Sequence, residues 1–142
     1  MPNDQVDVTA GAPNPESYTD NHDGTVTDNV TGLMWQQAVS TTTYTWAQAV
    51  AYCPTLILAG HSDWRLPSRI ELVSIVDFGA RSGEVNSDAA INATYFPSTP
   101  SSLFWSSSPL AGSSSYAWSV YFNYGYASYG GVSSAVLVRC VR

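Results

Sequence analysis

The chain has 142 residues, enough for one domain with a hydrophobic core and too few for two ordinary domains. It contains no lysine, its formal net charge is −6, and only 11% of its residues are charged, against roughly 25% in an average soluble domain. Nucleic acids and the anionic headgroups of membrane lipids are bound through Lys and Arg, so we expect neither as a partner. No apolar run approaches the roughly 20 residues needed for membrane insertion.

Neutral hydrogen-bonding residues, mainly Ser, Thr, Tyr, Gly and Asn, take the place of the missing charges. Surfaces of this kind are more common outside the cytosol than in it. We therefore expect an extracellular, cell-surface or virion-associated location, although no targeting signal is visible in the sequence.

The N-terminal third of the chain divides into a lead-in and a hairpin. Residues 1–17 contain three prolines and no hydrophobic periodicity, which predicts a flexible lead-in before an ordered domain over residues 18–142. Residues 25–36 predict a hairpin, because Val26 and Trp35 flank turn-forming residues that end at Gly32.

Two capping boxes predict the starts of two helices. In the first, the Thr45 hydroxyl can accept from the amide of Gln48, and apolar residues then recur at helical spacing until Pro54 ends or kinks the helix. The second box runs from Ser68 to Glu71, and its helix is expected to end near position 79. The apolar side of this second helix is expected to comprise Ile70, Leu72, Val73 and Val76.

The C-terminal part of the chain changes character. Residues 80–102 are mostly loop-like, and alternating apolar residues then predict strands over residues 103–107, 117–122 and 136–141. Two helices followed by a run of strands are typical of an α+β fold. We expect two helices packed on a twisted antiparallel sheet with long loops.

The two cysteines, Cys53 and Cys140, lie 87 positions apart. Metal clusters and redox motifs need close spacing, so this separation argues against both. Spacing alone leaves a disulfide and a pair of buried thiols equally open.

Three stretches of the sequence occur together, in the same order, in a known family. They are DNHDGTVTDNVTGLMWQ at residues 20–36, DWRLPS at residues 63–68 followed by Glu71-Leu72, and a third group made of FWSSS at residues 104–108, Ala117-Trp118 and VRCVR at residues 138–142. Over about residues 18–142 the chain resembles the C-terminal domain of the Legionella collagen-like protein, also called the DUF1566 family.

The resemblance implies a C-type lectin-like ligand-binding domain over residues 18–142. The RLPS segment is also similar to that of formylglycine-generating-enzyme-like domains, which share the C-type lectin fold. In that fold a disulfide joins a helix to the terminal strand, and Cys53 and Cys140 occupy those two places here.

The sequence offers little for catalysis. Formylglycine-generating enzymes use a nearby pair of cysteines, which this chain lacks, and no Gly-x-Ser-x-Gly elbow accompanies the two histidines, His22 and His61. We expect no enzymatic activity and no cofactor.

A metal site is also not expected. Asp20, Asp23 and Asp28 could offer oxygen ligands to calcium, but the bidentate Glu that closes an EF-hand-like loop is missing. We favour turns whose Asx side chains cap their own backbone. Arg65 and Glu71 are expected to form a structural ion pair. The five tryptophans are expected to lie in the core rather than to stack on sugars: Trp35, Trp46, Trp64, Trp105 and Trp118.

Residues 119–137 differ from the rest of the chain, since 11 of the 19 are Tyr, Ser or Gly. Antibody loops favour the same mixture, in which Tyr supplies rigid contact area and Ser and Gly supply adaptable hydrogen bonding. Val120 and Phe122 can face the core, and the tyrosines after them are expected on a loop. The predicted ligand contacts are Ser119, Tyr121, Asn123, Tyr124, Tyr126, Ser128, Tyr129, Ser133, Ser134 and Ala135.

The resemblance also suggests an origin for this composition. In a subset of the family this stretch is the variable region of a diversity-generating retroelement, which mutates adenines and so converts Asn codons into many others but never into Lys, Glu, Gln, Met or Trp. Residues 119–137 contain none of those five. The function expected is that of a diversified receptor for a protein or glycan on another cell or virion surface. The alternative is an adhesion or polysaccharide-binding domain of fixed specificity.

Overall fold

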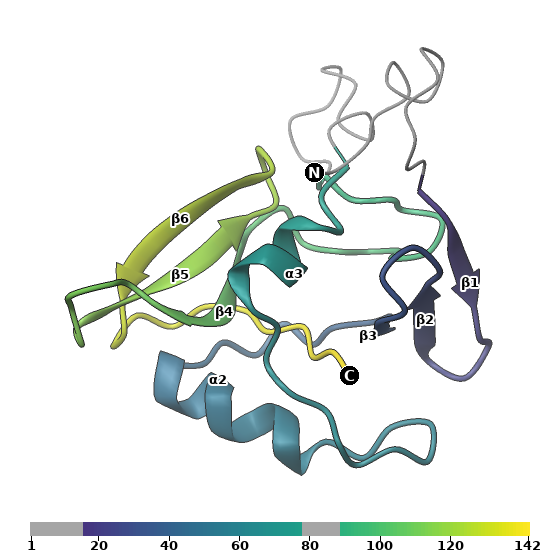
Figure 1. Ribbon diagram of the computed structural model, residues 1–142, viewed down its shortest axis with the longest axis horizontal. Coiled ribbons are helices and arrows are strands. Elements are labelled where there is room, and N and C mark those ends of the chain that lie inside the picture. The colour runs from purple at the N-terminus through teal and green to yellow at the C-terminus, as the bar shows by residue number, and fades with distance from the viewer. Residues whose placement is uncertain (1–15, 78–88) are drawn as a thin grey trace.

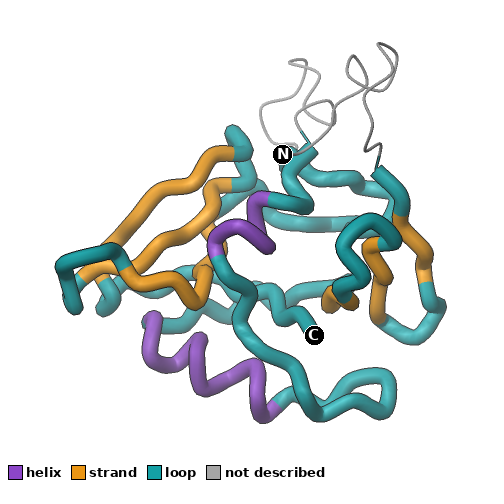
Figure 2. The backbone as a smooth tube through the Cα atoms, in the orientation of Figure 1, coloured by secondary structure: helices purple, strands orange, loops and turns teal. Residues whose placement is uncertain are grey.

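The computed structural model describes residues 16–77 and 89–142, which form two small antiparallel sheets and two short helices. The first sheet comprises β1 (Tyr18–Asp20), β2 (Thr25–Asp28) and β3 (Met34–Gln36), and the second comprises β4 (Leu103–Pro109), β5 (Tyr116–Tyr121) and β6 (Tyr126–Gly131). Between them in sequence lie α2 (Trp46–Tyr52), the 3-10 turn η1 (Cys53–Thr55) and α3 (Arg69–Val73). The two sheets lie at opposite sides of the molecule (Figures 1 and 2).

The expected C-type lectin-like α+β arrangement, two helices packed on one antiparallel sheet, is wrong. The strands form two separate three-stranded sheets, and the helices have only seven and five residues. Helix α2 gives way to η1 because Pro54 follows it. Helix α3 stops at Ser74, whose hydroxyl donates to the carbonyl of Glu71, and Ile70, expected on the apolar side, is 77% exposed. Neither described helix is long and apolar enough to cross a membrane.

Of the predicted lead-in, residues 1–15 lie outside the described residues, and the predicted hairpin after it is confirmed. Strands β2 and β3 pair antiparallel with Val26 opposite Trp35, and both side chains are fully buried. The turn between them needs Gly32, which has φ of +77° and donates its N–H to the carbonyl of Asp28 at 2.8 Å. Strand β1 then adds to the free edge of β2, so the hairpin becomes a sheet of its own.

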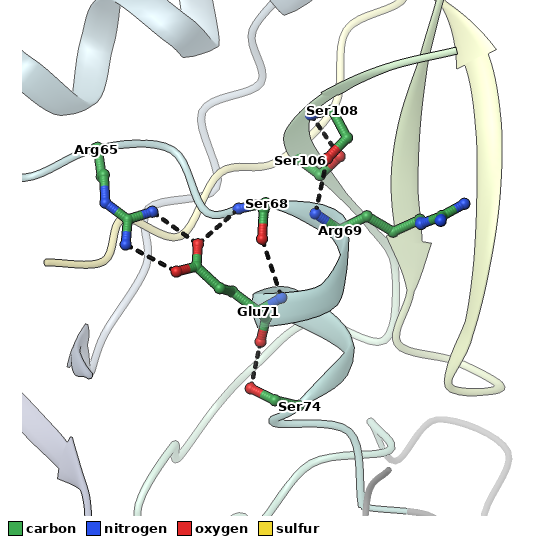
Figure 3. A network of polar contacts seen from close by, with 7 residues as sticks. All are labelled: Arg65, Ser68, Arg69, Glu71, Ser74, Ser106 and Ser108. Carbon is green, nitrogen blue, oxygen red and sulfur yellow. Dashed lines mark hydrogen bonds and ion pairs between the residues drawn. The ribbon is translucent and has the colours of Figure 1, made fainter. Parts of the chain in front are cut away.

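Both predicted capping boxes are present. The Thr45 hydroxyl accepts from the N–H of Gln48 at 3.4 Å, and the Gln48 side chain accepts from the N–H of Thr45 at 3.0 Å. Ser68 and Glu71 make the same reciprocal pair at 3.2 and 2.9 Å. Glu71 also accepts two hydrogen bonds from Arg65, at 2.7 and 2.8 Å, which confirms the structural ion pair (Figure 3).

The C-terminal segment holds the two sheets together, but not as the predicted strand. Residues 136–141 make only isolated bridges, because successive residues pair with different parts of the chain. The segment runs between the two sheets (Figure 1). Its bridging partners are Tyr44 for Val136, Phe104 for Leu137, and both Trp35 and Arg65 for Val141.

Within this segment Arg139 is a buried cation, 1% exposed. Its guanidinium donates to the carbonyl oxygens of Gln36 and Gln37 and to the hydroxyl of Thr99, and it lies 4.9 Å from the centroid of the Phe96 ring. Burial lowers the pKa of Arg139 to about 9, which still leaves it charged at neutral pH. The carbonyls and the aromatic face offset the desolvation of that charge.

Two buried clusters form the core. Trp35, Trp64 and Trp105 are almost completely buried, as expected, whereas Trp46 and Trp118 are only partly buried. The first cluster contacts both sheets and comprises Tyr18, Val26, Trp35, Leu72, Ile75, Val76, Ala90, Ile91, Phe96, Phe104, Val120, Phe122, Leu137 and Val141. The second lies between α2 and the sheet of β4–β6 and comprises Ala49, Cys53, Trp64, Leu66, Trp105, Ala117, Val136, Val138 and Cys140.

The disulfide implied by the family resemblance is confirmed. Cys53, at the start of η1, is bonded to Cys140 in the C-terminal segment, with Cα atoms 5.6 Å apart. Both residues are fully buried in the second cluster. The disulfide therefore fixes the C-terminal segment to the end of α2.

Candidate ligand-binding surface

The segment predicted to contact a ligand forms most of a hairpin made of β5 and β6. Six residue pairs align the two strands, from Tyr116 opposite Gly131 to Tyr121 opposite Tyr126. At the tip, Gly125 has φ of +80° and donates its N–H to the carbonyl of Tyr121 at 2.7 Å. Strand β6 was not predicted, since its residues were expected on a loop.

Phe122, whose ring packs in the core, anchors the tip of the hairpin. This ring is 1% exposed and meets Phe104 edge to face, with centroids 5.3 Å apart. Its backbone N–H donates to the carbonyl of Ser102 at 2.9 Å, and its carbonyl accepts from the N–H of Ala90. The exposed side chains of the tip are therefore carried on a fixed backbone.

The strand register places the tyrosines on two different faces of the sheet. Tyr121 and Tyr126 are cross-strand partners and share a face, and Trp118 and Tyr129 are partners that share a face. Tyr126 and Tyr129 are three positions apart on one strand, and side chains alternate along a strand, so their faces are opposite. The single tyrosine surface expected from the sequence is thus two surfaces.

The first surface, the tyrosine cluster, comprises Tyr121, Tyr124 and Tyr126 at the hairpin tip. Tyr124 stacks on Tyr126 with an interplanar angle of 20° and centroids 5.9 Å apart, and Tyr121 meets each of them edge to face. Tyr124 and Tyr126 are 51% and 50% exposed. Asn123 donates to the Tyr121 hydroxyl at 3.4 Å, and its Oδ1 accepts no hydrogen bond from the described residues. The cluster offers flat aromatic faces that are partly exposed, whereas Oδ1 of Asn123 is buried.

The second surface, the Trp118 cluster, comprises Tyr116, Trp118 and Tyr129. Tyr129 meets Tyr116 and Trp118 edge to face, with centroids 6.0 and 5.6 Å apart. Arg69 of α3 lies over the Trp118 ring at 4.3 Å from its centroid. The sequence analysis did not identify Arg69 or Tyr116 as site residues. The one signal in the sequence for Arg69 was its place between Ser68 and Glu71, the two paired residues of a capping box.

The other predicted contacts fall into three environments. Ser119 is 3% exposed and lies opposite Trp105 of β4, so it does not reach the surface. Ser128 is its partly buried partner on β6. Three residues are exposed on the loop after β6, away from the hairpin tip: Ser133, Ser134 and Ala135.

The three aspartates considered for calcium instead cap their own turns. Oδ1 of Asp20 accepts from the N–H of His22 at 2.9 Å, and Oδ1 of Asp23 accepts from the N–H and hydroxyl of Thr25. Oδ1 of Asp28 accepts from the N–H groups of the two residues after Asn29. No group of three His, Cys, Asp or Glu that could hold a metal ion occurs in residues 16–77 and 89–142.

Comparison with known proteins agrees with the resemblance of the motifs. The sequence model of the Legionella collagen-like protein C-terminal domain matches residues 24–142. This range includes α2, α3, the tyrosine cluster, the Trp118 cluster and the disulfide. No curated protein matches the chain. Membership of this family is consistent with a surface or ligand-binding role. The chain belongs to the family of Legionella collagen-like protein C-terminal domains.

Proposed function

We propose that the domain is a non-catalytic receptor whose recognition surface is the β5–β6 hairpin with the loop after it. The observation that carries this proposal is the tyrosine cluster, in which Tyr124 and Tyr126 are about half exposed although large aromatic side chains are usually more buried. Tyr is favoured in binding surfaces because it combines a large contact area with few rotatable bonds. The ligand is a protein or a glycan on another cell or virion surface, and the domain acts outside the cytosol.

We further propose that residues 119–137 are diversified, as the variable region of a diversity-generating retroelement. This proposal is supported by the relation between residue type and exposure within the segment. Its large apolar residues Val120, Phe122, Val136 and Leu137 are buried, whereas the exposed positions are Tyr, Ser and Ala. Exposed residues of such a segment can change without disturbing the core beneath them, which is what interchangeable contacts require.

A receptor of fixed specificity for a polysaccharide is the second candidate. It is favoured by the near-parallel, half-exposed rings of Tyr124 and Tyr126, because sugars bind to flat aromatic faces. Both candidates place the ligand at the same cluster. They differ in whether the residues there vary from one natural copy of the gene to another.

Binding screens with paired variants test the location of the surface. The wild-type domain and the Tyr124→Ser/Tyr126→Ser variant would be applied to glycan and surface-protein arrays, with Ile57→Ser as the control. Ile57 is 76% exposed and lies beyond η1, outside the hairpin, so its replacement also removes an exposed apolar side chain. We expect every strong signal of the wild type to be lost in the double variant and kept in the control, with unchanged melting temperatures. Signals that survive in the double variant would contradict the proposed surface.

A further inference from the structure

Three of the four described arginines are committed to partners within the domain. Arg65 forms a two-fold hydrogen-bonded pair with Glu71, and Arg142 forms one with Asp63. Arg139 is buried against backbone carbonyls. These three side chains stabilise the fold and have little capacity left for a ligand.

Arg69 differs from them. Its backbone N–H donates to the hydroxyl of Ser108 at 3.0 Å, but its guanidinium only stacks on the face of Trp118. Figure 3 shows the side chain pointing away from the Arg65–Glu71 pair and toward the second sheet. No carboxylate of the described residues forms an ion pair with it. Stacking uses the face of the guanidinium and leaves its edge of N–H donors for another partner.

Beside Arg69 lies a surface groove of about 370 Å³, within the range of ligand pockets. Its wall includes Ile70, which is 77% exposed, and Leu110, and Trp118 forms another side. The hydroxyls of Ser68 and Ser108 also line it, but each already accepts a backbone hydrogen bond within the domain. The groove therefore combines a mostly apolar wall with one cation and two serine hydroxyls, each of which has already accepted one hydrogen bond.

We propose that this groove is a second binding site, which takes a peptide segment with an Asp or Glu carboxylate next to an apolar side chain. The carboxylate pairs with the edge of the Arg69 guanidinium, and the apolar side chain rests on Ile70 and Leu110. Charge complementarity selects the carboxylate, because a guanidinium and a carboxylate form parallel hydrogen bonds. The wall of Ile70 and Leu110 favours an apolar side chain over a sugar, because these two residues offer a sugar no hydrogen bonds.

The charge of the whole domain limits how acidic this ligand is. The formal net charge is −6, so a polyanion would be repelled by most of the surface, whereas a single carboxylate meets its counter-charge locally. Arg69 and Trp118 also lie outside residues 119–137, so this site stays constant when those residues vary. Tyr129, which meets Trp118 edge to face, joins the groove to the segment proposed to be diversified.

A titration followed by NMR tests the groove without knowledge of the natural partner. The probes are N-acetyl-leucyl-glutamate amide and its glutamine counterpart, which differ only in the charge, with methyl glucuronide as a sugar carboxylate. The readout is the indole N–H resonance of Trp118 in the folded domain. We expect saturable shifts with the glutamate peptide, with a dissociation constant on the order of 1 mM for so small a ligand. The glutamine peptide should bind roughly fivefold more weakly.

Two variants complete the test. Arg69→Gln should weaken the binding of the glutamate peptide roughly fivefold, so that it binds as weakly as the glutamine peptide. Tyr124→Ser/Tyr126→Ser should leave peptide binding unchanged, so failure at the tyrosine cluster and failure at the groove are distinguishable. The proposal is overturned if the glutamate peptide causes no shift, if both peptides bind equally, if Arg69→Gln has no effect, or if only methyl glucuronide binds.

Discussion

The disulfide between Cys53 and Cys140 should supply a large part of the stability of this domain. It spans 87 positions, so its loss would free more than half of the 142-residue chain in the unfolded state. In the chain-entropy model, a crosslink of this span stabilises the folded state by about 4.6 kcal/mol at 25 °C. Unfolding entropies of about 2.1 cal/mol/K per residue convert this value into a fall in melting temperature of about 15 °C.

The test is the thermal unfolding of a Cys53→Ala/Cys140→Ala variant, followed by circular dichroism and calorimetry. Both cysteines are fully buried, so the cavities left by the sulfur atoms add to the loss. Treatment of the wild type with a reductant should lower its melting temperature toward that of the variant, and the variant itself should not respond to the reductant. A fall of less than about 3 °C would show that the disulfide contributes little to the stability of the domain.

Three further predictions concern single side chains. The hydrogen bonds from Arg65 lower the pKa of Glu71, so this carboxylate stabilises the fold above its ordinary pKa. Glu71→Gln should cost about 1 kcal/mol at pH 7, and the difference in unfolding free energy should shrink as the pH falls below the ordinary pKa of a glutamate. Burial and the nearby Asp77 raise the pKa of Glu16 to about 8, so the stability that the protonated form gives is lost as pH rises from 4.5 to 8. Glu16→Gln should therefore raise the melting temperature at pH 8 and not at pH 4, and equal effects at both values would contradict this. Ser119→Tyr should lower the free energy of unfolding, measured by chemical denaturation, by about 1–3 kcal/mol, because it overpacks a buried position. Tyr129→Ser, at an exposed position, should lower it little. The reverse order would show that Ser119 is accessible.

Features that depend on neighbouring residues could be predicted from the sequence. The capping boxes at Thr45 and Ser68 and the Gly32 turn are set by side chains within a few positions, and all three are present. The disulfide joins distant residues, so only the family resemblance could select it. The lengths of the helices and the division into two sheets depend on packing across the chain, which periodicity does not report.

The candidate site shows the same limit. The exposed tyrosines were identified by composition, but strand β6 was missed because a Tyr, Ser and Gly mixture resembles a loop. Without β6 there is no register, and it is the register that separates Tyr126 from Tyr129 and buries Ser119. Arg69 was overlooked because its importance comes from the pairing of the other arginines, which only the three-dimensional contacts reveal.

Sequencing the 3′ end of the gene across a natural population tests the diversified surface most directly. Residues 119–137 contain both exposed and buried positions, so variation in a diversified surface should be confined to the exposed ones. Codons for Tyr124, Tyr126 and Tyr129 should vary at adenine-template positions, beside a near-copy of the segment and a reverse transcriptase gene. Codons for the buried Val120 and Phe122 should stay constant. An invariant segment with no such cassette nearby, or variation that affects buried and exposed codons equally, would show that the surface is not diversified in this way.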